Sequence, residues 1–263
     1  MSRAHEPDTL LRVENLSKRF GGVEAVAGVS FHVRRGEIYS LIGPNGAGKT
    51  TTFNMISGVV PPSGGEVHFN GQPIAGMPAH RMAALGIGRT FQNLAVFKHA
   101  SVVENLLVGR HCHMRSNVFD AAWFLGRARR EELEHRRKVE EIIDFLEIED
   151  IRDMPVGALS YGLQKRVELG RALATEPKLL LLDEMVSGMN TEETEDIARF
   201  VLDIRDELGI TVLMVEHDMG IVMDVSDRIC VLNFGRKIAE GTPGEVAADP
   251  AVIDAYLGGA KAA

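Results

Sequence analysis

One glycine-rich segment has the residue types needed to bind a triphosphate. Residues 43–50 match the pattern G-x-x-x-x-G-K-[ST] throughout, as Gly43, Pro44, Asn45, Gly46, Ala47, Gly48, Lys49 and Thr50. Glycines let the backbone turn tightly, so that its N–H groups can point at anionic oxygens. Lys49 is predicted to contact the outer phosphates, and the Thr50 hydroxyl is predicted to bind Mg²⁺, with Thr51 close by. The segment therefore predicts a site for a nucleoside triphosphate and Mg²⁺.

A pair of acidic residues follows a run of leucines later in the chain. Asp183 and Glu184 come directly after the leucines at 179–182. Such a run is typical of a strand buried on both faces, and the carboxyl ends of parallel strands form the ligand-binding edge of an α/β sheet. Asp183 is therefore predicted to hold Mg²⁺ through water, and Glu184 to polarise the attacking water. The alternative, two acids that merely begin a loop, is disfavoured by the phosphate-binding segment in the same chain.

A serine and a glycine lie shortly before that strand. Ser160 and Gly162 belong to residues 159–164, which read Leu-Ser-Tyr-Gly-Leu-Gln. Ser160 can cap a helix expected over residues 163–174, and capping alone is a sufficient structural explanation. The position of the segment ahead of Asp183 leaves a second, functional interpretation open.

Hydrophobic periodicity and turn residues predict alternating strands and helices around these segments. A strand at 37–42 leads into the glycine-rich turn, and a helix at 50–56 follows it. Further strands are expected at 11–19, 29–34, 66–69, 179–182, 211–215, 228–233 and 237–239, and further helices at 101–110, 121–146, 163–174, 191–208, 217–224 and 250–258. This alternation indicates an α/β chain with a parallel core. Residues from about 93 to 170 are expected to form an inserted, mostly helical lobe.

Taken together and in this order, the motifs resemble those of the ATP-binding subunits of ABC transporters. Residues 43–50 resemble the family's Walker A motif, and residues 159–164 resemble its signature motif. Residues 179–183 resemble its Walker B motif, with Glu184 in the place of the catalytic acid. The resemblance spans about residues 10–257. It implies that ATP and Mg²⁺ bind between Phe20, the glycine-rich turn, Gln92 and Asp183.

Several residues acquire roles only through this resemblance. Phe20 falls at the aromatic that stacks on adenine, although an aromatic residue is more often part of a core. Gln92 falls at the Q-loop, where it is expected to help bind the metal and sense the attacking water. His217 falls at the switch histidine, where it is expected to contact the γ-phosphate. In this family Ser160 and Gly162 cap the γ-phosphate held by a second, facing subunit. The catalytic residues implied are Lys49, Gln92, Glu184 and His217.

Within the family the chain is most similar to the ATP-binding subunits of branched-chain amino acid importers. The likeness rests on residues 18–22, 89–93, 216–219 and 255–258 and on the long helical insertion. Three positions depart from the usual family pattern, namely Leu163, Met185 and Thr191. None of them removes a phosphate or metal ligand, so ATPase activity is expected to survive. Their effect is expected to fall on loop geometry and on coupling to partner subunits.

The resemblance implies an α/β P-loop NTPase fold of the ABC ATPase type, with a RecA-like core, an antiparallel β subdomain and an inserted helical subdomain. The expected division is a flexible N-terminus at 1–9, the ATP-binding core with the β subdomain at 10–92 and 171–258, the helical signature subdomain at 93–170, and a C-terminal tail at 259–263. The implied partners are a second ATP-binding subunit, identical or different, and two integral-membrane permease subunits. A periplasmic or extracellular substrate-binding protein is an indirect partner.

Composition limits the remaining possibilities. The 263 residues include 37 acidic and 29 basic side chains, a net charge of −8, which argues against binding nucleic acid. No stretch of 18 apolar residues occurs, and residues 1–9 lack the apolar core of a signal peptide. Together with these observations, the resemblance implies a peripheral position at the cytoplasmic face of the inner membrane. Cys112 and Cys230 are expected to be reduced, buried thiols.

Three functions compete at this stage. The first is an ATPase that powers uptake of branched-chain or other hydrophobic amino acids. The second is an ATPase of the same fold that serves a lipid or lipopolysaccharide exporter. The third is a soluble ABC-type ATPase that acts on ribosomes or DNA. This third function is disfavoured because such proteins usually carry two ATPase units or long coiled-coil arms, and the sequence shows neither.

Overall fold

The computed structural model describes residues 8–90, 95–113 and 127–258. Within these ranges a small antiparallel sheet has the strand order β2-β1-β4-β5. Its strands are β1 (Thr9–Phe20), β2 (Val23–Arg34), β4 (Gly64–Phe69) and β5 (Gln72–Pro73). Asn70 and Gly71 join β4 to β5 with positive φ angles of 50° and 77°, the combination that a tight hairpin turn requires. β1 already begins at Thr9, the last residue of the expected N-terminal segment.

A larger sheet, six-stranded in the described part of the chain, has the order β10-β9-β3-β8-β7-β6. Its strands are β3 (Ile38–Ile42), β6 (Ile87–Arg89), β7 (Leu179–Asp183), β8 (Thr211–Val215), β9 (Arg228–Asn233) and β10 (Arg236–Gly241). All neighbours are parallel except β9 and β10, which form an antiparallel hairpin. The carboxyl ends of β3, β7 and β8 therefore lie at one edge, as the sequence predicted for a parallel core.

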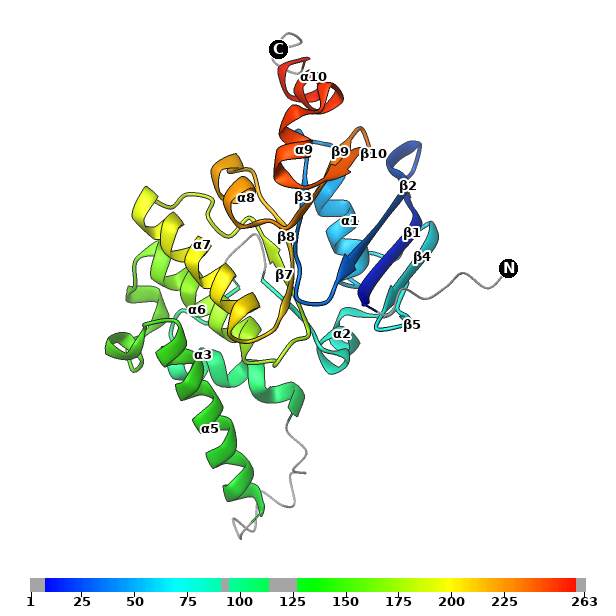
Figure 1. Cartoon of the computed structure of the whole chain (residues 1–263). Coiled ribbons are helices and arrows are strands. Elements are labelled where there is room, and N and C mark those ends of the chain that lie inside the picture. The colour runs from blue at the N-terminus through cyan, green and yellow to red at the C-terminus, as the bar shows by residue number, and fades with distance from the viewer. Residues whose placement is uncertain (1–7, 91–94, 114–126, 259–263) are drawn as a thin grey trace.

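Helices cover the larger sheet, and Figure 1 shows α3, α5, α6 and α7 gathered on the side away from the small sheet. The α-helices are α1 (Lys49–Ile56), α2 (Ala79–Leu85), α3 (Val102–Gly109), α5 (Arg127–Phe145), α6 (Tyr161–Leu173), α7 (Thr191–Asp206), α8 (Met219–Val225), α9 (Pro243–Ala248) and α10 (Pro250–Gly258). Short 3₁₀ turns lie at Arg110–His113, Glu149–Ile151 and Val156–Ala158. Among the described residues no helix is long and apolar enough to cross a membrane.

The sheet is buried on both faces because successive residues of its strands enter two different cores. In β7, Leu180 and Leu182 pack with the helices, whereas Leu179 and Leu181 pack with the small sheet and α1. All five residues of this strand are buried. The four consecutive leucines are needed because both faces of β7 are buried. Their burial also fixes the position of Asp183 and Glu184 at the end of the strand.

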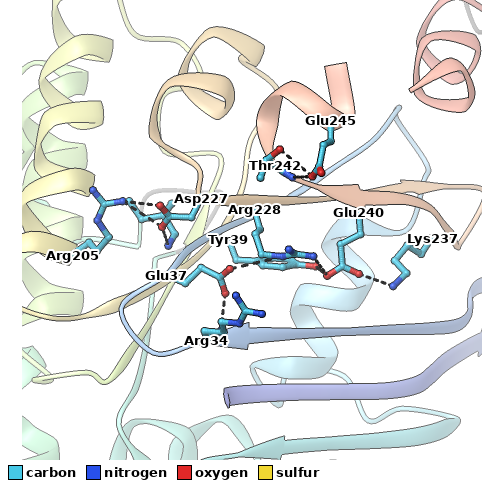
Figure 2. A network of polar contacts seen from close by, with 11 residues as sticks. Arg34, Glu37, Tyr39, Arg205, Asp227, Arg228, Lys237, Glu240, Thr242 and Glu245 are labelled. Carbon is cyan, nitrogen blue, oxygen red and sulfur yellow. Dashed lines mark hydrogen bonds and ion pairs between the residues drawn. The ribbon is translucent and has the colours of Figure 1, made fainter. Parts of the chain in front are cut away.

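A polar network anchors the β9–β10 hairpin to the start of β3 (Figure 2). The Tyr39 hydroxyl donates to Glu240 Oε1 at 2.9 Å, and Lys237 Nζ donates to Glu240 Oε2 at 2.6 Å. At the other end of the hairpin, the Gly235 N–H donates to the carbonyl of Ala47 at 3.0 Å. The network therefore fixes a hairpin that in turn contacts the glycine-rich turn.

Several sequence expectations need correction. The helix expected at 217–224 begins at Met219, because the Asp218 side chain accepts a hydrogen bond from the Ile221 N–H and acts as the N-cap, so His217 lies before the helix. The helix expected at 163–174 begins at Tyr161 for the same kind of reason, with Ser160 as N-cap. Cys112 is exposed, on a 3₁₀ turn at the surface, while Cys230 is buried as expected. The sequence reasoning also missed α2, β6 and α9, which are short.

Candidate active site

The glycine-rich turn connects the end of β3 to the start of α1 and presses against neighbouring backbone. Gly43 has a φ of +148°, and a Cβ there would lie 2.1 Å from the carbonyl oxygen of Leu232. Gly48, the N-cap of α1, has a φ of +100°, and a Cβ there would lie 2.6 Å from the carbonyl oxygen of Ala25. Both positions exclude every residue with a side chain. The turn thus brings its backbone N–H groups to the positive end of α1, which favours an anion.

Lys49 is the buried cation of the turn. Its side chain is 5% exposed, and its Nζ donates to the carbonyl oxygens of Gly43 at 2.6 Å and Pro44 at 3.1 Å. Burial lowers the pKa of Lys49, and the negative charge of Glu184 opposes that shift. A phosphate would offer the ammonium an anionic partner in place of two neutral carbonyls.

A pocket of about 450 Å³ opens beside the turn, a volume suited to a small ligand. It is lined by Phe20, Ala25, Asn45, Gly46, Ala47, Gly48, Lys49, Thr50, Thr51, Glu184 and His217. The structure therefore brings together most of the residues that the sequence singled out, although they come from four separate segments. Phe20 lies at the end of β1 with its ring 50% exposed and the Lys18 ammonium 5.1 Å from its centroid.

Glu184 and His217 meet in this pocket after two adjacent strands. His217 Nε2 lies 3.0 Å from Glu184 Oε1, a distance that allows one hydrogen bond. The backbone of Glu184 has a φ of +50°, which is uncommon for a residue other than glycine, and its N–H donates to the carbonyl of Val215 at 2.9 Å. Strained backbone of this kind often occurs at functional sites. The hydrogen bonds hold the carboxylate in the pocket next to the phosphate-binding turn.

Asp183 is buried, and it directly precedes Glu184, which lines this pocket. Its Oδ2 accepts a hydrogen bond from Arg89 Nη2 at 3.0 Å, while its Oδ1 is buried with no hydrogen-bond partner among the described residues. Burial raises the pKa of Asp183, and the charge and hydrogen bond of Arg89 oppose that shift. An unpartnered carboxylate oxygen fits a role in holding the water shell of Mg²⁺, because hard oxygen ligands suit that ion.

Two other predicted site residues, Ser160 and Gly162, lie outside this pocket. Ser160 is exposed at the start of α6, where its Oγ accepts a hydrogen bond from the Leu163 N–H at 3.3 Å. Gly162 is buried, and a Cβ there would lie 2.3 Å from Glu193 Oε1 at the start of α7. Neither residue lines the pocket. Gln92 lies outside the described residues.

The C-terminal helix contacts the phosphate-binding turn. Burial raises the pKa of Tyr256 on α10, and a hydrogen bond from the backbone N–H of Gly43 to the phenol opposes that shift. The carbonyl of the same Gly43 accepts the Lys49 ammonium. The sequence reasoning used residues 255–258 only as a sign of similarity, and it did not foresee this contact.

Glu216 is a second residue beside the site to which the sequence assigned no role. Its side chain is 3% exposed, and its Oε1 accepts a hydrogen bond from the Val186 N–H at 3.3 Å. Burial raises its pKa to about 7, against the effect of hydrogen bonds from the backbone of Val186, Met185 and His217. Glu216 thus joins the loop after Glu184 to the segment that carries His217.

The raised pKa of Glu216 predicts how stability depends on pH. Between the unfolded pKa of 4.5 and the folded pKa of about 7, the folded protein binds more protons than the unfolded chain, so stability falls as pH rises through this window. Glu216→Gln removes this titration. Between pH 5.5 and pH 8, the free energy of unfolding in urea should therefore decrease by about 2 kcal/mol less in this variant than in the wild type. Parallel curves for the two proteins would contradict the assignment.

Comparison with known families identifies the family to which the chain belongs. A family model described as "ABC transporter" matches residues 26–187, more than half of the chain. A second, described as "Branched-chain amino acid ATP-binding cassette transporter", matches residues 236–262. The chain therefore belongs to the ABC transporter family, and its P-loop α/β fold is that of the family's ATPases. It is an enzyme that binds and hydrolyses ATP, as the motifs predicted.

Individual relatives agree over nearly the whole chain. BraF of Pseudomonas aeruginosa, a high-affinity branched-chain amino acid transport ATP-binding protein, is 41% identical over 249 residues, covering 95% of this chain and 98% of BraF. LptB of Haemophilus influenzae, a lipopolysaccharide export system ATP-binding protein, is 37% identical, with coverage of 95% and 98%. The ADP conformation of MJ1267, an ATP-binding cassette of an ABC transporter, superimposes with a TM-score of 0.83 at 35% identity, covering 95% of this chain and 99% of MJ1267.

Proposed function

We propose that this chain is the ATP-hydrolysing subunit of an importer for branched-chain or other hydrophobic amino acids. The observation that carries the proposal is the match of residues 236–262 to the branched-chain family, in addition to the general ABC transporter match. The higher identity to BraF, 41% against 37% to LptB, supports the same choice. The matched segment includes Tyr256, whose contact with Gly43 joins it to the phosphate-binding turn.

Mg-ATP is the ligand that suits the pocket. We assign the phosphates to the backbone of residues 43–51 and to Lys49, and the adenine to the exposed ring of Phe20. Stacking of a base on an aromatic ring is worth about 1–3 kcal/mol in comparable contacts. The residues assigned to Mg²⁺ are Thr50, Gln92 and Asp183. When bound, the ion would neutralise charge that develops on the phosphates.

Glu184 is assigned the role of polarising the attacking water, because its carboxylate lies in the pocket with Lys49. His217 is assigned to orient that carboxylate and to contact the γ-phosphate, since its Nε2 already lies 3.0 Å from Glu184 Oε1. Phosphoryl transfer needs mainly positioning and charge stabilisation, which is what this set of residues supplies.

A second ATP-binding subunit is the partner proposed for Ser160 and Gly162. Both residues lie at the start of α6 and away from the pocket of their own chain. In a head-to-tail pair they would cap the γ-phosphate bound by the facing subunit. ATP would then join the two subunits, and hydrolysis would separate them.

An apolar groove of about 490 Å³ is the proposed docking surface for the permease. It lies between α2 and β6 on one side and α3 and α6 on the other, and its lining includes Phe97, 56% exposed, and Val108, 47% exposed. We assign it to a cytoplasmic helix of the permease, an apolar partner of matching shape. The helical subdomain at 93–170 would thus hold the chain at the cytoplasmic face of the membrane, with the substrate-binding protein on the opposite side.

The test is to tag the full-length chain, identify the membrane proteins that co-purify with it, and measure uptake by the reconstituted assembly. We expect two permease subunits and ATP-dependent uptake of leucine, isoleucine and valine. Co-purification with exporter permeases and ATP-driven extraction of lipopolysaccharide would instead support the function in LptB's name. Either result separates the two functions.

A matched pair of variants tests the docking surface. Val108→Glu places a charge in the groove, and Leu133→Glu makes the same change at a 58% exposed position on α5 outside the groove. We expect Val108→Glu to reduce permease recovery at least about tenfold, because a buried unpaired charge is costly. Leu133→Glu should leave recovery unchanged. Equal recovery of permease by both variants would contradict the assignment of the groove.

A further inference from the structure

The side chain of Arg89 connects α1, the helix that follows the phosphate-binding turn, with Asp183 at the end of β7. It lies at the end of β6, 12% exposed, and its Nη2 donates to Asp183 Oδ2 at 3.0 Å and to Asn54 Oδ1 at 2.8 Å. Its Nη1 donates to the Ser57 hydroxyl, and its guanidinium lies 5.1 Å from the Phe53 ring centroid. Phe53 and Asn54 belong to α1, the helix that follows the phosphate-binding turn. The guanidinium is therefore fixed against α1 while it holds the carboxylate of β7.

This arrangement treats the two oxygens of Asp183 differently. Oδ2 is occupied by Arg89, and Oδ1 is buried with no hydrogen-bond partner among the described residues. The backbone is fixed as well, because the Asp183 N–H donates to Thr90 Oγ1 at 3.2 Å and the Thr90 N–H donates to Leu181 at 2.9 Å. Leaving a buried carboxylate oxygen without a hydrogen bond costs free energy of folding. A ligand that contacts Oδ1 would recover that cost.

We propose that Arg89 is a positioning residue that holds one oxygen of Asp183 so that the other faces the water shell of Mg²⁺. The inference rests on the proposed function, in which Asp183 helps to hold that ion. Residues that orient a metal ligand typically change metal affinity by about 10–100-fold when they are removed. A second effect opposes this one, because Arg89 is a cation that repels Mg²⁺. The two effects have opposite signs, so the direction in which the Mg²⁺ affinity changes distinguishes them.

Arg89 also lines the apolar groove assigned to the permease. The residue that orients Asp183 is thus directly accessible to whatever fills the groove. A helix that packs there would contact Arg89, which also contacts Asp183. Arg89 would then connect permease docking with the metal site.

The experiment compares Arg89→Gln and Arg89→Lys with the wild type, using the full-length chain. Binding of trinitrophenyl-ATP is titrated against Mg²⁺, and binding is also measured in EDTA. We expect Arg89→Gln to raise the half-saturating Mg²⁺ concentration at least about tenfold while binding in EDTA changes less than about twofold. Arg89→Lys retains the charge, and it should recover part of the Mg²⁺ response. It also serves as the test if the glutamine variant does not fold.

Arg110→Gln is the control for removing a buried arginine. Arg110 is 3% exposed, its Nη1 donates to the carbonyl of Ala174 at 2.9 Å, and it does not line the pocket beside the glycine-rich turn. It should lower the melting temperature without changing the Mg²⁺ response. An unchanged Mg²⁺ response in both Arg89 variants, an equal shift in Arg110→Gln, or tighter Mg²⁺ binding in Arg89→Gln would each overturn the inference. Failure of the proposed metal role itself would be seen separately, as a Mg²⁺ response that Asp183→Asn does not alter.

Discussion

Replacing Glu184 with glutamine is expected to reduce ATP turnover at least about 100-fold while ATP binding stays within about threefold of the wild type. The carboxylate lies in the pocket with Lys49 and within 3.0 Å of His217, where it can polarise water beside the terminal phosphate. Glutamine has the same shape but cannot accept a proton. The contacts with phosphate come from the glycine-rich turn and Lys49, and this substitution does not alter them.

Two measurements check this expectation together. Phosphate release gives turnover, and size-exclusion chromatography with light scattering shows whether ATP joins two subunits. With hydrolysis blocked, Glu184→Gln should form a dimer with ATP and remain a monomer without it. If the natural partner is a different ATP-binding subunit, the dimer should appear only when that subunit is added.

Glu207→Gln is the matched control, because Glu207 is an exposed carboxylate at the end of α7. Its turnover should equal that of the wild type. Full ATPase activity in Glu184→Gln would remove Glu184 from the catalytic role. A monomer at every ATP concentration, alone and with the partner subunit, would count against the shared site.

The parts of the fold that the sequence predicted are those with a local physical cause. The leucines at 179–182 predict a strand because burial on both faces leaves no polar position, and the structure buries every one of them. Residues 43–50 predict the turn because its backbone needs glycine locally, with φ angles of +148° at Gly43 and +100° at Gly48. These patterns lie within a few neighbouring residues, so the sequence displays them directly.

The parts that the sequence did not predict depend on contacts between distant segments. Arg89 meets Asp183 across 94 positions, and Glu216 meets Val186 across 30. Nothing in the residues next to Arg89 or Glu216 indicates which carboxylate or amide each will contact. Short elements failed for another reason, since β6 has 3 residues and α9 has 6, too few to show a periodicity. The exposure of Cys112 likewise depends on how the end of α3 lies on the surface.

Lys49→Met is expected to weaken ATP binding roughly 100-fold or more and to leave the nucleotide-free protein about as stable as the wild type. Charge-assisted hydrogen bonds to phosphate are worth about 1.5–3 kcal/mol each, and each 1.4 kcal/mol is a factor of ten in affinity. Without nucleotide the same ammonium is buried against two backbone carbonyls, and burial lowers its pKa. Methionine has a similar shape and needs no countercharge, so the loss of two hydrogen bonds is offset by relief from burying a charge.

Thermal unfolding with and without Mg-ATP separates the two effects. The melting temperature without nucleotide should shift by less than about 3 °C, and the increase that ATP causes in the wild type should disappear. Lys165→Met provides the contrast, because Lys165 is fully buried and its Nζ lies 3.4 Å from Glu168 Oε2. Removing that lysine leaves the buried Glu168 without its cationic neighbour, and it should lower the free energy of unfolding by about 3 kcal/mol or more. If Lys49→Met were destabilised as much as Lys165→Met, Lys49 would be a structural cation. If Lys49→Met stays about as stable as the wild type while Lys165→Met is destabilised, the buried charge of Lys49 serves to bind the triphosphate and does not stabilise the fold.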